Sequence, residues 1–245
     1  MVPYLRQWLR SLPERPRVLV EPFAGGAIIG LTAAAEGLAD RVVLVELDED
    51  VASVWETIIY GDADWLVNQI LTIELTHERI GEIVGRRGMG TKERALATVV
   101  ENRINRGGIL APGAGRVKNG ENGRGLLSRW YPETLCRRIR DIVAIRERLE
   151  FVHGDGLEAL ERRLGEASFA FFVDPPYTVA GRRLYKHSEM DHRRLLSLAG
   201  QLAGDSLITY DDSQEIVRLA LGEGLQVCWV PMKTTHHEQK LELLI

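Results

Sequence analysis

The residues Asp174-Pro175-Pro176-Tyr177 place a carboxylate, two proline carbonyls and an aromatic ring directly after an apolar run, residues 169–173. The run predicts a buried strand, so the tetrapeptide is expected at the carboxyl edge of a sheet. Because proline fixes φ and has no N–H, its carbonyl is held rigidly. A flat molecule with an exocyclic amine could donate to the carboxylate and to a carbonyl while Tyr177 stacks on its ring. An ordinary turn after a strand is the alternative, and these four residues alone do not exclude it.

A second set of candidates is the turn Pro22-Phe23-Ala24-Gly25-Gly26, between an expected strand, 17–21, and an expected helix, 27–36. This order lets a cofactor approach the backbone at the carboxyl edge of a parallel sheet. The next expected strand, residues 42–45, ends in Glu46, whose carboxylate could accept hydrogen bonds from both hydroxyls of a ribose. A solvated charge at a strand end is the alternative for Glu46.

The glycine turn lacks the patterns that bind phosphate groups. Its glycines stand at positions 25, 26 and 30, which is not G-x-G-x-x-G, and the chain has no G-x-x-x-x-G-K-[ST] sequence. A cofactor with a pyrophosphate is therefore disfavoured, and a nucleoside cofactor without phosphates fits better. S-adenosyl-L-methionine is the candidate.

A basic, glycine-rich stretch lies between Asn102 and Arg140, where nine basic residues face two acidic ones and seven glycines interrupt regular structure. Such a stretch could follow a phosphate backbone and order on contact, whereas the alternative is a solvated surface loop. We expect contact with nucleic acid here and at a lysine that follows the tetrapeptide. The candidate residues are Arg103, Arg106, Arg116, Lys118, Arg124, Arg129 and Lys186.

The composition is that of an ordinary soluble protein, with 245 residues, 45% hydrophobic residues and a net charge of −4. No run is apolar enough to predict a membrane span or a signal peptide, which favours the cytoplasm. Cys136 and Cys228 lie too far apart, in unlike contexts, to suggest a disulfide or a metal site. His236 and His237 are adjacent, but no carboxylate or cysteine spacing completes a metal site, so no metal is expected.

Strands and helices alternate on both sides of a mainly helical block, which predicts an α/β fold with a mostly parallel, doubly wound sheet. The sheet domain is expected from residues 1–60 and 150–245, and the helical lobe from residues 61–149. The expected strands after the block are 151–155, 169–173, 207–210, 226–230 and 241–245.

The order of these motifs resembles that of the α-class DNA adenine-N6 methyltransferases, also called the D12 or Dam-like class. Glu21-Pro22-Phe23-Ala24-Gly25-Gly26 comes first, an acidic strand end follows, and Asp174-Pro175-Pro176-Tyr177, the DPPY motif, comes last. Asp155 and the segments 208–211 and 233–237 match as well, so the resemblance covers nearly the whole chain. It implies a Rossmann-like S-adenosylmethionine-dependent methyltransferase sheet and makes the inserted lobe the target-recognition domain.

The resemblance also implies roles for individual residues. Asp174 and the Pro175 carbonyl would hold the N6 amine of an adenine flipped out of double-stranded DNA, and Tyr177 would stack on that base. The implied catalytic residues are Asp174, Pro175, Pro176 and Tyr177. The implied cofactor-binding residues are Pro22, Phe23, Ala24, Gly25, Gly26, Glu46, Asp155 and Asp174. Asp155 would hold the cofactor's adenine amino group. A monomer is expected, with a cognate restriction enzyme as a possible functional partner.

Three alternatives remain open at this point. Enzymes that methylate adenine in RNA usually have Asn in place of Asp174, and those that methylate cytosine N4 more typically have Ser. The third alternative is a catalytically impaired or silent DNA-binding protein. It arises because the family has a short Gly-Lys-type motif before its first helix, and Met1 stands about where that lysine would be.

Overall fold

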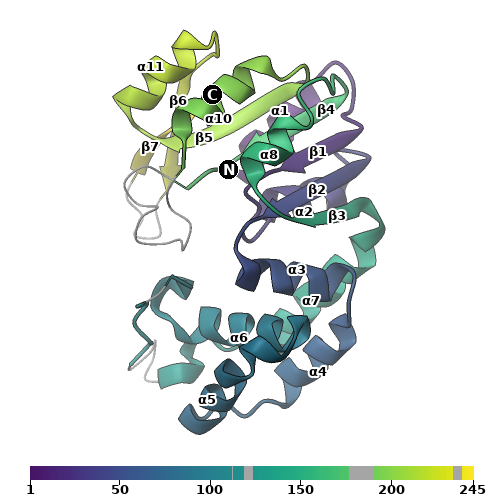
Figure 1. Cartoon of the computed structure of the whole chain (residues 1–245), viewed down its shortest axis with the longest axis vertical. Coiled ribbons are helices and arrows are strands. Elements are labelled where there is room, and N and C mark those ends of the chain that lie inside the picture. The colour runs from purple at the N-terminus through teal and green to yellow at the C-terminus, as the bar shows by residue number, and fades with distance from the viewer. Residues whose placement is uncertain (112, 119–123, 177–189, 234–238) are drawn as a thin grey trace. The chain divides into compact units, whose positions relative to one another are not determined.

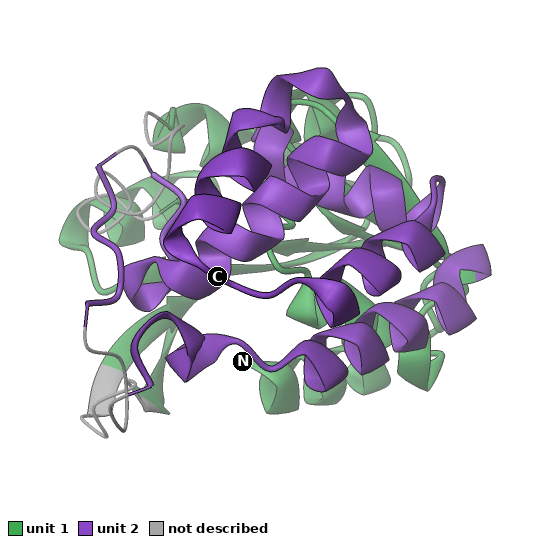
Figure 2. Cartoon of the chain, turned by 90° about the horizontal axis from the view of Figure 1, so that it is seen from below, with its two compact units in different colours: residues 1–47, 148–182, 188–245 green, residues 48–147, 183–187 purple. Residues whose placement is uncertain are grey.

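The computed structural model describes residues 1–111, 113–118, 124–176, 190–233 and 239–245. The chain divides into two compact units, which Figure 2 shows in separate colours. Unit 1 consists of Met1–Leu47 and the described residues from Arg148 onward, and unit 2 of Asp48–Glu147. The division therefore falls at residues 47/48 and 147/148, whereas the sequence placed it at 60/61 and 149/150.

Unit 1 is built on one sheet, which has seven strands within the described residues, in the order β3-β2-β1-β4-β5-β7-β6 (Figure 1). The paired strands among β1 to β5 run parallel to one another, whereas β7 is antiparallel to both β5 and β6. The strands are β1 (Val18–Glu21), β2 (Arg41–Glu46), β3 (Leu149–His153), β4 (Phe169–Val173), β5 (Asp205–Asp211), β6 (Cys228–Lys233) and β7 (Gln239–Leu244).

The order of the strands reverses between β1 and β4. The chain runs outward from β1 through β2 to β3, and then returns to place β4 against the other side of β1. This is the topological switch point of a doubly wound sheet, the place where such folds bind ligands at the carboxyl ends of the strands. The predicted fold class, a doubly wound Rossmann-like α/β fold with a mainly helical insert, is confirmed.

Both faces of the central strands are buried, as parallel strands require. Val20 and Phe171 belong to a core cluster that also contains residues of three helices, α8 (Gly156–Glu161), α10 (His192–Gln201) and α11 (Gln214–Gly222). Leu19 and Phe172 point to the opposite face and are also fully buried. Two helices from the amino-terminal part of the chain pack together, α1 (Val2–Ser11) and α2 (Ile28–Glu36), and α2 also contacts β1 and β2.

Unit 2 is helical throughout its regular structure in the described residues. Its α-helices are α3 (Glu49–Ile59), α4 (Ala63–Thr72), α5 (His77–Gly85), α6 (Thr91–Ile104) and α7 (Pro132–Ile145), and its short 3-10 helices include η1 (Arg87–Met89), η2 (Arg106–Gly108) and η4 (Gly125–Arg129). Helix α3 belongs to this unit because it packs against α6 and α7, although the sequence assigned it to the sheet domain. No helix in the described part of the chain has the length and apolar character needed to cross a membrane.

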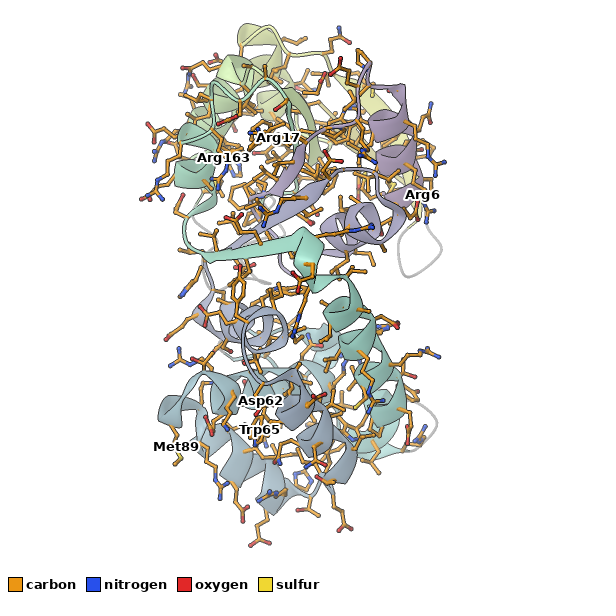
Figure 3. The ribbon with its side chains drawn as sticks, turned by 90° about the vertical axis from the view of Figure 1, so that its right-hand side faces the viewer. Arg6, Arg17, Asp62, Trp65, Met89 and Arg163 are labelled. Atoms are coloured by element: carbon orange, nitrogen blue, oxygen red, sulfur yellow. The ribbon has the colours of Figure 1, made fainter. Side chains whose placement is uncertain are left out.

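Polar contacts within and between helices add to the hydrophobic core of unit 2. Arg87 forms ion pairs with Asp50 of α3 and with Glu101 of α6. At the start of α4, Asp62 accepts a hydrogen bond from the Trp65 N–H at 2.9 Å, and the Lys92 ammonium lies 4.9 Å from the Trp65 ring centre. Figure 3 labels Asp62 and Trp65 on this helix.

Candidate functional site

The acidic ends of three neighbouring strands lie at the carboxyl edge of the sheet. Glu21 ends β1, Glu46 ends β2, and Asp174 directly follows β4. Parallel pairing of β1 with both β2 and β4 brings these ends to the same edge, because parallel strands terminate on one side of a sheet. The predicted candidates from distant parts of the sequence therefore converge at the switch point.

The glycine turn after β1 is bonded to the end of β2. The Ala24 N–H donates to the Val45 carbonyl at 2.9 Å, and the Gly25 N–H donates to Glu46 Oε2 at 2.8 Å. Gly25 has φ +48°, a left-handed conformation that favours glycine. A Cβ added at Gly25 or Gly26 would meet no atom of the described residues within 4 Å, so these residues leave the turn open on that side. The backbone is thus accessible where the sequence expected a cofactor.

The same turn packs against the start of α8, after β3. A Cβ on Gly156 would lie 2.3 Å from the Pro22 carbonyl oxygen and 2.6 Å from Phe23 Cε1, so only glycine fits there. Asp155 caps α8, because its Oδ1 accepts from the N–H groups of Leu157 at 2.7 Å and Glu158 at 3.1 Å. The structure therefore places Asp155 beside the turn and gives its Oδ1 a capping role that the sequence analysis did not predict.

Glu21 is a buried carboxyl group at the switch point, with 3% of its surface exposed. Its Oε2 accepts a hydrogen bond from the Gly30 N–H of α2 at 2.7 Å. Burial raises the pKa of Glu21 to about 8, the charge of Asp174 adds to that rise, and the Gly30 hydrogen bond opposes it. The sequence analysis used Glu21 only as a strand end and part of the family motif. An acidic residue ending a fully apolar strand is the signal that identifies it.

Asp174 is held by a residue of the neighbouring strand. Thr209 on β5 is buried, and its Oγ1 donates to Asp174 Oδ1 at 2.5 Å. Asp174 itself is exposed, Pro175 is buried and Pro176 is half-buried. Tyr177 lies outside the described residues. The sequence analysis placed Thr209 in a family-like segment without a role, and its contact with Asp174 spans 35 positions of the chain.

The next residue on β5, Tyr210, makes a further contact behind this site. Its hydroxyl lies 2.9 Å from Nδ1 of His192, at the start of α10. Burial raises the pKa of Tyr210, and burial lowers the pKa of His192, so both groups are neutral near pH 7. This contact ties α10 to the strand that carries Thr209.

The described basic candidates all lie in unit 2, around a loop that closes on α6. The Arg106 N–H donates to the Gly115 carbonyl at 2.8 Å, and the Val117 N–H donates to the Ile104 carbonyl at 2.8 Å. Arg103 and Arg129 are half-buried, and the remaining described candidates are exposed: Arg106, Arg116, Lys118 and Arg124. Lys186 lies outside the described residues.

The guanidinium groups of two of these arginines contact other described residues. The Arg124 guanidinium lies 5.6 Å from the centre of the Tyr131 ring, and Arg129 Nη1 donates to the Asn105 carbonyl at 2.7 Å. No group of three or more His, Cys, Asp or Glu side chains within the described ranges is arranged to hold a metal ion. His236 and His237 lie outside those ranges.

No protein-family model matches the chain, and no curated protein matches it. Among solved structures, the chain is similar to one described as a "putative RNA methyltransferase" from Pyrococcus horikoshii, with a TM-score of 0.46 and 12% identity over 99% of this chain and 81% of that chain. A second, described as a "putative transferase" from the same organism, has a TM-score of 0.38 and 10% identity over 98% of this chain and 61% of that chain. Similarity at this level does not bear on function.

Proposed function

We propose that the protein is a DNA methyltransferase that transfers the methyl group of S-adenosyl-L-methionine to N6 of a flipped adenine. One observation carries this proposal. An open glycine turn bonded to Glu46 and the Asp174-Pro175-Pro176 segment meet at the switch point of a doubly wound sheet. This is the arrangement that the sequence resemblance implies.

The residues at this edge are suited to a nucleoside cofactor. Glu46 at the end of β2 offers carboxylate oxygens to ribose hydroxyls, and the open side of Gly25 and Gly26 admits a ligand against the backbone. Pro22, Phe23 and Ala24 complete that turn, and Asp155 lies beside it. When bound there, S-adenosyl-L-methionine supplies an electrophilic methyl group.

Asp174 and the Pro175 carbonyl would act on the nucleophile. The lone pair of an adenine N6 is delocalised into the ring, so the free amine is a poor nucleophile. Hydrogen bonds from the amine to two acceptors favour a pyramidal nitrogen and offset its developing positive charge. Thr209 would orient Asp174, because its hydroxyl already holds one carboxylate oxygen. Alignment of the reacting groups would supply much of the remaining rate.

The target base must leave the duplex to reach this edge, at an unstacking cost of about a few kcal/mol. We propose that Tyr177 stacks on the extruded base and returns about 1–3 kcal/mol of that cost. Unit 2 would bind the duplex through its basic candidate residues named above, whose phosphate contacts position the protein without reading sequence.

The test is nucleoside mass spectrometry of unmethylated DNA incubated with the protein and methyl-labelled S-adenosyl-L-methionine. Label in N6-methyladenine supports the proposal. Label on cytosine N4, or on adenine only when RNA is supplied, would change the proposed substrate but not the proposed methyl-transfer reaction. Absence of label from all three, with DNA binding retained, favours a catalytically silent DNA-binding protein.

A further inference from the structure

Three arginines of unit 2 are fixed around one hydrophobic core. Arg103 is the second-to-last residue of α6, Arg129 ends η4, and Arg138 lies in α7. Each directly precedes a buried residue of the same core cluster, and these residues are Ile104, Trp130 and Ile139. The three buried side chains belong to one core, whereas the arginines beside them lie up to 35 positions apart in the sequence.

The loop beside α6 fixes the position of Arg129. Its Nη1 donates to the Asn105 carbonyl, and the Asn102 side-chain amide donates to the Gly108 carbonyl at 2.7 Å. Gly108 has φ +73°, and a Cβ there would lie 3.0 Å from Asn102 Nδ2 and 3.1 Å from Arg129 Nη2. Glycine at position 108 therefore avoids a steric clash with the Arg129 guanidinium.

The positive charges of the three arginines are not neutralised by acidic side chains of the described residues. None of the three forms an ion pair there, although other arginines of unit 2 do, such as Arg87 with Asp50 and Glu101. Partial burial lowers the pKa of Arg103, and the charges of Arg129 and Arg138 lower it further. Like charges gathered at a partly desolvated position repel one another, and a bound anion would relieve that repulsion.

We propose that Arg103, Arg129 and Arg138 together form a binding site for one phosphodiester group of a nucleic-acid backbone. Guanidinium groups suit this ligand because their N–H donors match the geometry of phosphate oxygens. The inference deepens the proposed function, on which it rests for the identity of the nucleic acid as DNA. It adds Arg138, which the sequence analysis left out of the candidate set.

The test compares Arg138→Gln with Arg137→Gln, since both residues are exposed on α7 and neither forms an ion pair with the described residues. Binding of a fluorescein-labelled DNA duplex is measured by anisotropy between about 50 and 200 mM salt. Loss of one phosphate contact should flatten the slope of log affinity against log salt by about 0.9 and weaken binding about five-fold near 0.15 M salt. Arg137→Gln should leave both values at those of the wild type.

Thermal unfolding separates a binding role from a structural one. Removing one of three repelling charges should leave the melting temperature of Arg138→Gln unchanged or raise it. A lower melting temperature together with weaker binding would assign Arg138 a structural role and overturn the proposal. Equal binding by Arg138→Gln and Arg137→Gln would overturn it directly.

The binding assay needs neither cofactor nor turnover, so it is independent of the proposed reaction. If the wild-type protein binds DNA but transfers no methyl group, the proposed function is contradicted and the proposed phosphate site is not. If the enzyme is active and its Arg138→Gln variant binds DNA normally, only the proposed phosphate site is contradicted. A charge effect seen with an RNA duplex and not with DNA contradicts DNA as the partner, and failure of the wild type to bind either nucleic acid contradicts both proposals.

Discussion

Replacing the buried carboxyl of Glu21 by an amide should make the stability of the protein less sensitive to alkaline pH. Glu21→Gln keeps the size of the side chain and keeps a carbonyl oxygen that can accept the Gly30 hydrogen bond. It removes the only part of the group that titrates. The difference in unfolding free energy between this variant and the wild type therefore measures the effect of burying an ionisable carboxyl at the switch point.

The magnitude follows from the pKa of Glu21, which burial raises from 4.5 to about 8. Below pH 4.5 the carboxyl is protonated in both the folded and the unfolded chain, and its contribution to stability is complete. Between pH 4.5 and 8 the unfolded chain releases the proton while the folded chain keeps it. Folding then loses up to about 1.4 kcal/mol per pH unit, with a ceiling of about 5 kcal/mol above pH 8.

The assay is denaturant unfolding of the wild type and of Glu21→Gln at about pH 5 and pH 9. Titrations of other groups cancel in the difference between the two proteins, so Glu21→Gln should gain several kcal/mol on the wild type as pH rises. Glu36→Gln is the control, because the hydrogen bond from Arg6 lowers the pKa of Glu36. The Glu36 carboxyl is therefore ionised in the folded and mainly ionised in the unfolded chain over this range, and the difference between Glu36→Gln and the wild type should stay nearly constant. A constant difference between Glu21→Gln and the wild type across this range would refute the reasoning.

Two further substitutions test how the site is held. Thr209→Val keeps the shape of the side chain but removes the donor to Asp174, so kcat should fall roughly ten-fold with KM for DNA unchanged, as measured by steady-state kinetics. Thr209→Ser keeps the hydroxyl and should recover activity. An equal loss of kcat in Thr209→Ser would contradict the role of the hydroxyl. Gly156→Ala forces a Cβ against the Pro22 carbonyl and should cost about 1–3 kcal/mol of unfolding free energy and weaken cofactor binding, as measured by denaturation and calorimetry. Gly165→Ala, where a Cβ meets no atom of the described residues within 4 Å, is its control, and equal effects of the two alanines would refute the packing argument.

The central strands and the turn could be predicted from the sequence because they depend on local patterns. Apolar runs of four or five residues predicted β1, β2 and β4, and the acidic residues at their ends followed from the same pattern. Parallel pairing then placed those ends at one edge. The fold class and the convergence of Glu46 with Gly25 were therefore accessible before any coordinates.

Contacts between distant segments could not be predicted in this way. Neither the hydrogen bond from Gly30 to Glu21 nor the hydrogen bond from Thr209 to Asp174 has a signal in the local pattern. Helix α3 was assigned to the wrong unit because its apolar face would suit either a sheet or another helix, and only its packing against α6 decides.

The basic stretch illustrates the same limit. Its charge identified arginines suited to phosphate contact, but charge counts do not show which of them meet. The convergence of Arg103, Arg129 and Arg138 depends on the shared core beneath α6, η4 and α7. Candidates such as Arg124, which lies over the Tyr131 ring, are indistinguishable from them in the sequence.

Asp174 is the residue on which the proposed reaction depends most directly, and single-turnover methyl transfer to DNA by Asp174→Ala tests its role. The control is Asp205→Asn, an exposed aspartate at the amino end of β5, on the opposite edge of the sheet. We predict that Asp174→Ala keeps its fold and most of its DNA affinity but forms no N6-methyladenine, while Asp205→Asn reacts at the wild-type rate. Near-normal transfer by Asp174→Ala would contradict the proposed site.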